Sequence, residues 1–114
     1  MEIGIGIEKS RDVSTLTVSG EINAITCADL ETALGGLMEE GETRIVLDLE
    51  GTRYISSAGL RVVLGAAQRL HRRGRFVISG ADENVSDILR IAGFPSIIDM
   101  FDNAARARAA VAAP

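Results

Sequence analysis

Aromatic residues are scarce in this chain. They make up 4% of its 114 residues, and tryptophan is absent. Because single-strand nucleic-acid binders and many carbohydrate sites stack their ligands on aromatic rings, both classes are disfavoured. An excess of basic charge is also missing, since 12 Lys and Arg stand against 16 Asp and Glu, a net charge of −4. This balance argues against a nucleic acid as the main partner, and the core must be largely aliphatic.

Cysteine and histidine are each present once, as Cys27 and His71. A single cysteine forms no internal disulfide, and one cysteine with one histidine does not make a zinc cluster. No uninterrupted apolar run approaches the roughly 20 residues that cross a bilayer. The first residues also lack the basic and apolar regions of a signal peptide. These absences predict a soluble cytoplasmic protein with no membrane partner, metal or cofactor.

The remaining composition is that of a globular protein, with 46% hydrophobic and 25% charged residues. The length predicts a single domain over residues 1–114. Alternating apolar residues at 3–7 and 13–19 predict an opening β-hairpin. Short apolar runs at 44–49 and 76–78 predict interior strands covered on both faces. We expect a turn at 50–52, and Ile97 with Ile98 are candidates for a short edge strand.

Four segments have apolar residues at helical spacing. The first includes Leu30, Leu34 and Leu37 and ends near Gly41, and the second runs from Leu60 to Leu70. A third helix ends at Gly93, and an alanine-rich one covers 104–113. The N-cap candidates are Asn23 or Thr26 for the first helix, Ser56 or Ser57 for the second, and Asp102 or Asn103 for the last. The order predicts an α/β fold with helices on a mixed sheet, antiparallel at its first edge and otherwise largely parallel.

Candidate catalytic groupings fail on spacing. The segment GIGIEKS at 4–10 has Glu8 where a phosphate-binding loop needs glycine. Ser57 and His71 are 14 residues apart, which is about 21 Å along one helix, so they are not a dyad. We interpret Cys27 as a packed residue and Asp48 as a turn residue. The sequence therefore does not predict an enzyme.

The most informative segment is 48–61, in which a strand leads to two hydroxyl groups at the start of a helix. The unpaired amides and the dipole of a helix N-terminus favour an anion, so a phosphate attached to Ser57 is compatible with the fold. It adds about −1.5 to −2 charges to the surface and would repel a docked partner. Arg61, four residues on, either reaches such a phosphate or lies along the helix surface. The alternatives are that Ser56 and Ser57 only cap the helix, or that it holds a nucleotide or other anion noncovalently.

Two motifs, GEINAITCADL at 20–30 and DLEGTRYISSAGLRVVL at 48–64, resemble the STAS domain family. The resemblance extends over essentially the whole chain and is to the stand-alone bacterial anti-sigma factor antagonists. It implies the STAS fold, a mixed β-sheet with an N-terminal hairpin and about four helices. It also implies a non-catalytic protein that binds a serine-kinase anti-sigma factor of the GHKL ATPase type and so releases a sigma factor.

In the family, phosphorylation by that kinase ends the binding and a metal-dependent serine phosphatase restores it. The phosphoacceptor of the family falls on Ser57. Ser56 stands where the family often has Asp, and Ala58 where it often has a second hydroxyl, which leaves Ser56 as the alternative acceptor. The family commonly has an acid near Asn23. The residues that the resemblance places on the docking surface are Glu21, Asn23, Thr26, Ser56, Ala58, Gly59, Leu60 and Arg61.

Overall fold

The computed structural model describes residues 3–113 of the chain. The elements, in chain order, are β1 (Ile3–Ser10), β2 (Val13–Ile22), α1 (Cys27–Glu39), β3 (Arg44–Ile55), α2 (Ser57–Leu70), β4 (Arg75–Ser79), α3 (Glu83–Ile91), the 3₁₀ turn η1 (Phe94–Ser96), β5 (Met100–Phe101) and α4 (Ala104–Val111). The predicted α/β class and the four predicted helices are confirmed. Each of the helices within residues 3–113 is too short or too polar to cross a membrane.

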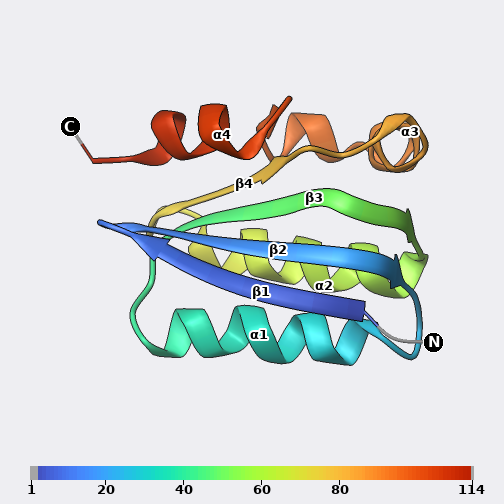
Figure 1. Ribbon diagram of the computed structural model, residues 1–114, viewed down its shortest axis with the longest axis horizontal. Coiled ribbons are helices and arrows are strands. Elements are labelled where there is room, and N and C mark those ends of the chain that lie inside the picture. Colours follow the sequence, from blue (N-terminus) through green and yellow to red (C-terminus); the bar gives the residue numbers. More distant parts are fainter. Residues whose placement is uncertain (1–2, 114) are drawn as a thin grey trace.

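The five strands form one sheet in the order β1-β2-β3-β4-β5. β1 and β2 pair antiparallel as the predicted hairpin, and the other neighbouring pairs are parallel. The antiparallel edge and the parallel centre are therefore confirmed. Each parallel pair is joined through a helix, which places the starts of the helices near the carboxyl ends of the strands (Figure 1).

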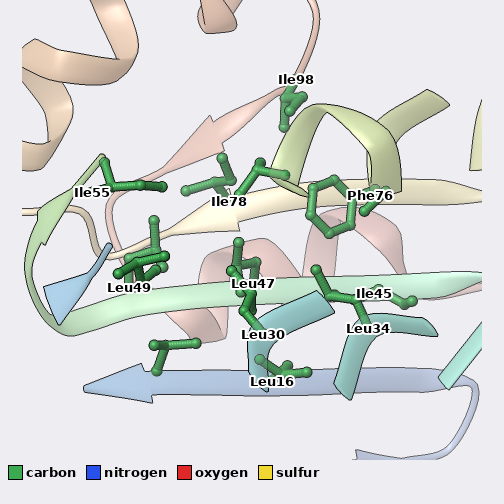
Figure 2. Close-up of a cluster of buried hydrophobic side chains, with 14 of the residues drawn as sticks. Leu16, Leu30, Leu34, Ile45, Leu47, Leu49, Ile55, Phe76, Ile78 and Ile98 are labelled. Carbon is green, nitrogen blue, oxygen red and sulfur yellow. The ribbon is translucent and has the colours of Figure 1, made fainter. Parts of the chain in front are cut away.

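Side chains of β3 alternate between two hydrophobic clusters, as the pleat of a strand requires. Ile45 and Leu47 point into the larger cluster, which contains buried residues of α1, α2 and α3. Figure 2 shows Leu30 and Leu34 of α1 among the side chains of this cluster. Val46 belongs to the smaller cluster, where α4 covers the other face of the sheet. Both faces of β3 are thus buried, as the apolar run at 44–49 predicts.

The predicted turn at 50–52 is wrong, because β3 continues through it to Ile55. The strand keeps its partner there: Gly51 lies beside Ser19 of β2, and the Thr52 hydroxyl donates to the Val18 carbonyl at 2.8 Å. Gly51 is required by this close approach, since an added Cβ would lie 2.9 Å from the Ser19 Cβ. The pairing of β2 with β3 shifts register on either side of Ser19 and Gly20, so the two strands stay paired through this segment. The longer strand carries the chain beside the end of β2 before α2 begins.

Two smaller expectations are also corrected. Asp48 is a buried residue within β3 rather than a turn residue, and its Oδ1 accepts from the Ser79 hydroxyl at 3.2 Å. The short edge strand is Met100–Phe101 instead of Ile97 and Ile98. The amide of Ile98 donates to the Phe94 carbonyl in the turn η1, so it is not available to a sheet.

Candidate functional site

The start of α2 is organised by Ser56. This residue is the N-cap, in extended conformation, and its Oγ accepts from the Gly59 amide at 3.3 Å. Of the two serines predicted as cap, Ser56 therefore takes that position. Ser57 is the first residue of the helix and its side chain is exposed. The cap is half-buried and engaged, whereas the neighbouring hydroxyl is open to solvent.

The loop between β2 and α1 is organised by Asn23 and Thr26. The side-chain carbonyl of Asn23 accepts from the amides of Ile25 and Thr26, both at 2.9 Å. The buried Thr26 hydroxyl donates to the Glu21 carbonyl at 2.7 Å and accepts from the Asn23 amide at 2.8 Å. Of the two predicted N-cap candidates of α1, Thr26 takes that position, although its side chain makes no capping hydrogen bond to the helix. These bonds fix the shape of the loop instead.

The two segments lie side by side at one end of the molecule (Figure 1). The Ser56 amide donates to the Ile22 carbonyl at 2.8 Å, which ties the start of α2 to the end of β2. Gly59 permits the close packing beneath, because a Cβ there would lie 2.6 Å from Ile22 Cγ2 and 2.8 Å from Ile55 Cγ1. Segments about 30 residues apart in sequence thus form one surface.

The residues predicted for docking do not all face solvent. Ser57 and Arg61 are exposed, and Glu21, Asn23, Ser56, Ala58 and Leu60 are half-buried. Thr26 and Gly59 are buried, which contradicts a direct contact with a partner. Their positions make them supports of the surface, one from within the loop and one from beneath the helix.

Two exposed apolar side chains near this surface were not singled out by the sequence analysis. Ile25 in the loop is 83% exposed, and Tyr54 near the end of β3 is 43% exposed. Tyr54 pairs with Glu21 of β2, so it lies at the same end of the sheet. The sequence signal for Ile25 is an isolated isoleucine in a polar loop. The predicted end of the strand at residue 49 hides the position of Tyr54 in the sheet. Exposed residues of this kind are typical anchors of protein interfaces.

We expect Thr26→Val to destabilise the protein by about 1–3 kcal/mol, because the part-buried Glu21 carbonyl and backbone amide of Asn23 each lose a hydrogen-bond partner. Urea denaturation monitored by circular dichroism measures the change. Thr32→Val is the matched control, since Thr32 is exposed on α1. Equal stability of the two variants would show that the Thr26 hydroxyl does not organise the loop.

The described part of the chain contains no group of three or more His, Cys, Asp or Glu side chains placed to hold a metal ion. The start of α2 presents an exposed hydroxyl at a helix N-terminus, beside a loop that is ordered by its own hydrogen bonds. Such an arrangement suits recognition by another protein, because the surface is preorganised.

Comparison with curated proteins identifies several bacterial regulators as relatives. BtrV of Bordetella bronchiseptica, named as an anti-sigma factor antagonist, is 38% identical over 82% of this chain and 81% of its own length. The anti-sigma-B factor antagonist of Listeria monocytogenes is 30% identical over 88% of this chain and 90% of its own length.

Comparison with solved structures shows the same fold. An anti-sigma factor antagonist from Mycobacterium paratuberculosis superposes with a TM-score of 0.90 at 24% identity, covering 96% of this chain and 93% of that one. SpoIIAA of Bacillus in its phosphorylated form gives a TM-score of 0.75 at 18% identity, covering 96% of this chain and 100% of that one. The model of the STAS domain matches residues 5–107. The chain therefore belongs to the STAS domain family, and its mixed sheet with four helices is the STAS fold.

Proposed function

We propose that this chain is an anti-sigma factor antagonist, which binds an anti-sigma factor and thereby releases a sigma factor. The support is that its relatives from Bordetella and Listeria carry that description over most of their length. The docking surface is the end of the molecule where the loop after β2 meets the start of α2. The protein acts there as a single STAS domain that binds in the cytoplasm without catalysing a reaction.

The binding is switched by phosphorylation of Ser57. A phosphate at this position meets the positive end of the α2 dipole, so the helix stays formed. It also adds about −1.5 to −2 charges to the docking surface. Binding of the partner would then be opposed by the cost of desolvating the phosphate or by repulsion from acidic groups of the partner. Arg61 lies one helical turn further on and on the same face, from which it can reach the phosphate.

The difference in exposure between Ser57 and Ser56 supports Ser57 as the phosphoacceptor. The Ser57 side chain is exposed, whereas the Ser56 hydroxyl is half-buried and accepts from the Gly59 amide. A kinase must seat the acceptor oxygen in line with the transferred phosphoryl group, which favours the free side chain. The family resemblance further suggests that the kinase is the anti-sigma factor itself, of the GHKL type, and that a metal-dependent serine phosphatase resets the switch.

The alternative function, a module that holds a nucleotide or another anion at the start of α2, receives less support. The Ser56 side chain already accepts from the Gly59 amide, which is one of the donors that such an anion would use. The anion would therefore replace an existing hydrogen bond rather than fill a vacant position.

Mass spectrometry of the protein purified from its native host tests the choice of acceptor. We expect a phosphopeptide modified at Ser57, lost in Ser57→Ala and retained in Ser56→Ala. The second variant loses a helix cap, which costs about 0.5–2 kcal/mol, so its folding is checked by thermal denaturation. A phosphate found on Ser56, or none in any growth condition that activates the host's sigma factors, would contradict the proposal.

A further inference from the structure

A groove runs between α1 and α2, which pack beside each other on the sheet (Figure 1). Its volume is about 440 Å³, and both helices line it. This size lies within the range of about 300–1,000 Å³ that is usual for small-molecule sites. The groove lies along the flank of the helices, whereas the docking surface lies at their N-terminal end. It is therefore a second surface of the protein, which shares Arg61 with the docking surface but whose apolar floor and Arg69 the proposed function does not use.

The groove is open because two helical glycines line it. A Cβ added at Gly65 of α2 would have no neighbour within 4 Å, and one at Gly35 of α1 would meet only the Arg69 Nη1, at 3.8 Å. Glycine in a helix interior costs about 1 kcal/mol relative to alanine. At neither position does a neighbouring group pack closely enough to exclude a side chain, so packing does not explain the glycine. The structural effect of the two glycines is to leave the groove unfilled.

The groove has an apolar floor and a cationic rim. Leu34 and Ala66 are buried side chains of the floor. Arg61 and Arg69 are exposed on α2 at the rim, on either side of Gly65 and about 12 Å apart along the helix axis. Within residues 3–113, no carboxylate lies within 4 Å of either guanidinium group.

The charges of the lining favour a negatively charged ligand. Glu31 is the one acidic residue among the described residues that line the groove, against two arginines. Arg69 reaches over the groove toward Gly35, which places its guanidinium next to the space that the glycines leave. A planar guanidinium binds a carboxylate through two parallel hydrogen bonds.

We propose that the groove between α1 and α2 binds a small amphipathic carboxylate. Its apolar body lies on Leu34 and Ala66 between the two glycines, and Arg69 holds its carboxylate. The inference does not rest on the proposed function, because the floor of the groove and Arg69 lie outside the docking surface and the test requires no protein partner.

Titration of the ¹⁵N-labelled protein with decanoate below its micelle concentration, followed by amide chemical shifts, tests this proposal. We expect saturable shifts confined to α1 and α2. Gly65→Leu should abolish them, since its side chain fills the groove. Gly36→Leu is the matched control, because Gly36 is also helical with no neighbour within 4 Å of an added Cβ but does not line the groove. Thermal denaturation verifies that both variants fold.

A second pair of variants tests the role of the charge. Arg69→Ala should weaken decanoate binding about tenfold, while Arg73→Ala, which removes an equal charge from an exposed residue outside the groove, should not. The neutral analogue 1-decanol should bind wild type as weakly as decanoate binds Arg69→Ala. Absence of saturable shifts in wild type, equal binding by Gly65→Leu and Gly36→Leu, or equal binding of decanol and decanoate would overturn the proposal. Dimerisation of wild type that Gly65→Leu prevents would overturn it too, since a second copy would then be the occupant.

Discussion

Ser57→Asp is expected to weaken binding to the anti-sigma factor by about 100-fold, which corresponds to about 2.7 kcal/mol. The carboxylate introduces a negative charge at an exposed position of the docking surface, at the first residue of α2. Its charge would be desolvated or opposed when the partner docks. The fold should be unaffected, because an acidic residue in the first turn interacts favourably with the helix dipole.

Isothermal titration calorimetry with the purified anti-sigma factor measures this effect. Ser57→Asn is the matched control, because asparagine has nearly the size of aspartate without its charge. We expect Ser57→Asn to bind within a few-fold of wild type. If Ser57→Asn and Ser57→Asp are weakened equally, steric fit at this position rather than charge controls the binding, and the phosphate switch loses its electrostatic basis.

Gly59→Ala should give the largest loss of stability among single-methyl additions in α2, about 1–3 kcal/mol. The new methyl group would lie 2.6 Å from Ile22 Cγ2 and 2.8 Å from Ile55 Cγ1. Both isoleucines are buried in the larger hydrophobic cluster, so the start of α2 must move away from the sheet to relieve the steric clash. That displacement would shift Ser57 as well, because it begins the same helix. We therefore expect weaker partner binding together with a melting temperature several degrees lower.

Gly65→Ala provides the control for Gly59→Ala. It makes the same chemical change in the same helix, but its methyl group meets nothing within 4 Å. Alanine should there stabilise the helix by about 0.5–1 kcal/mol. Differential scanning calorimetry of the two variants should thus show melting temperatures shifted in opposite directions. A similar shift for both would show that the start of α2 is not held tightly against Ile22 and Ile55.

Local patterns in the sequence predicted most of the fold. The spacing of Leu30, Leu34 and Leu37 indicated α1, and all three side chains are buried. The run at 44–49 indicated a strand covered on both faces, which β3 is. These features depend on burial periodicity, which is encoded within one or two helical turns or a few strand residues. The resemblance to the STAS family added the expected arrangement of the strands and helices, which local patterns do not determine.

The rest depends on contacts between distant segments. Glu50, Gly51 and Thr52 have the composition of a turn, and the pairing of Gly51 and Thr52 with the end of β2 keeps the segment in a strand. Either Ser56 or Ser57 is a good N-cap from sequence, and the hydrogen bond of Ser56 to the Gly59 amide decides between them. The buried positions of Thr26 and Gly59 likewise follow from packing that no local pattern encodes. The groove beside Gly65 is defined by missing side chains on two helices, which only the assembled fold brings together.

In the proposed switch, a negative charge at Ser57 releases the partner. Its most direct test uses wild type, Ser57→Ala and Ser57→Asp as baits in lysate of the native host, with quantitative mass spectrometry of the retained proteins. We expect a GHKL-type ATPase to be retained by wild type and Ser57→Ala and lost with Ser57→Asp. Retention of the same ATPase by all three baits would contradict it, as would the absence of any such ATPase from all of them.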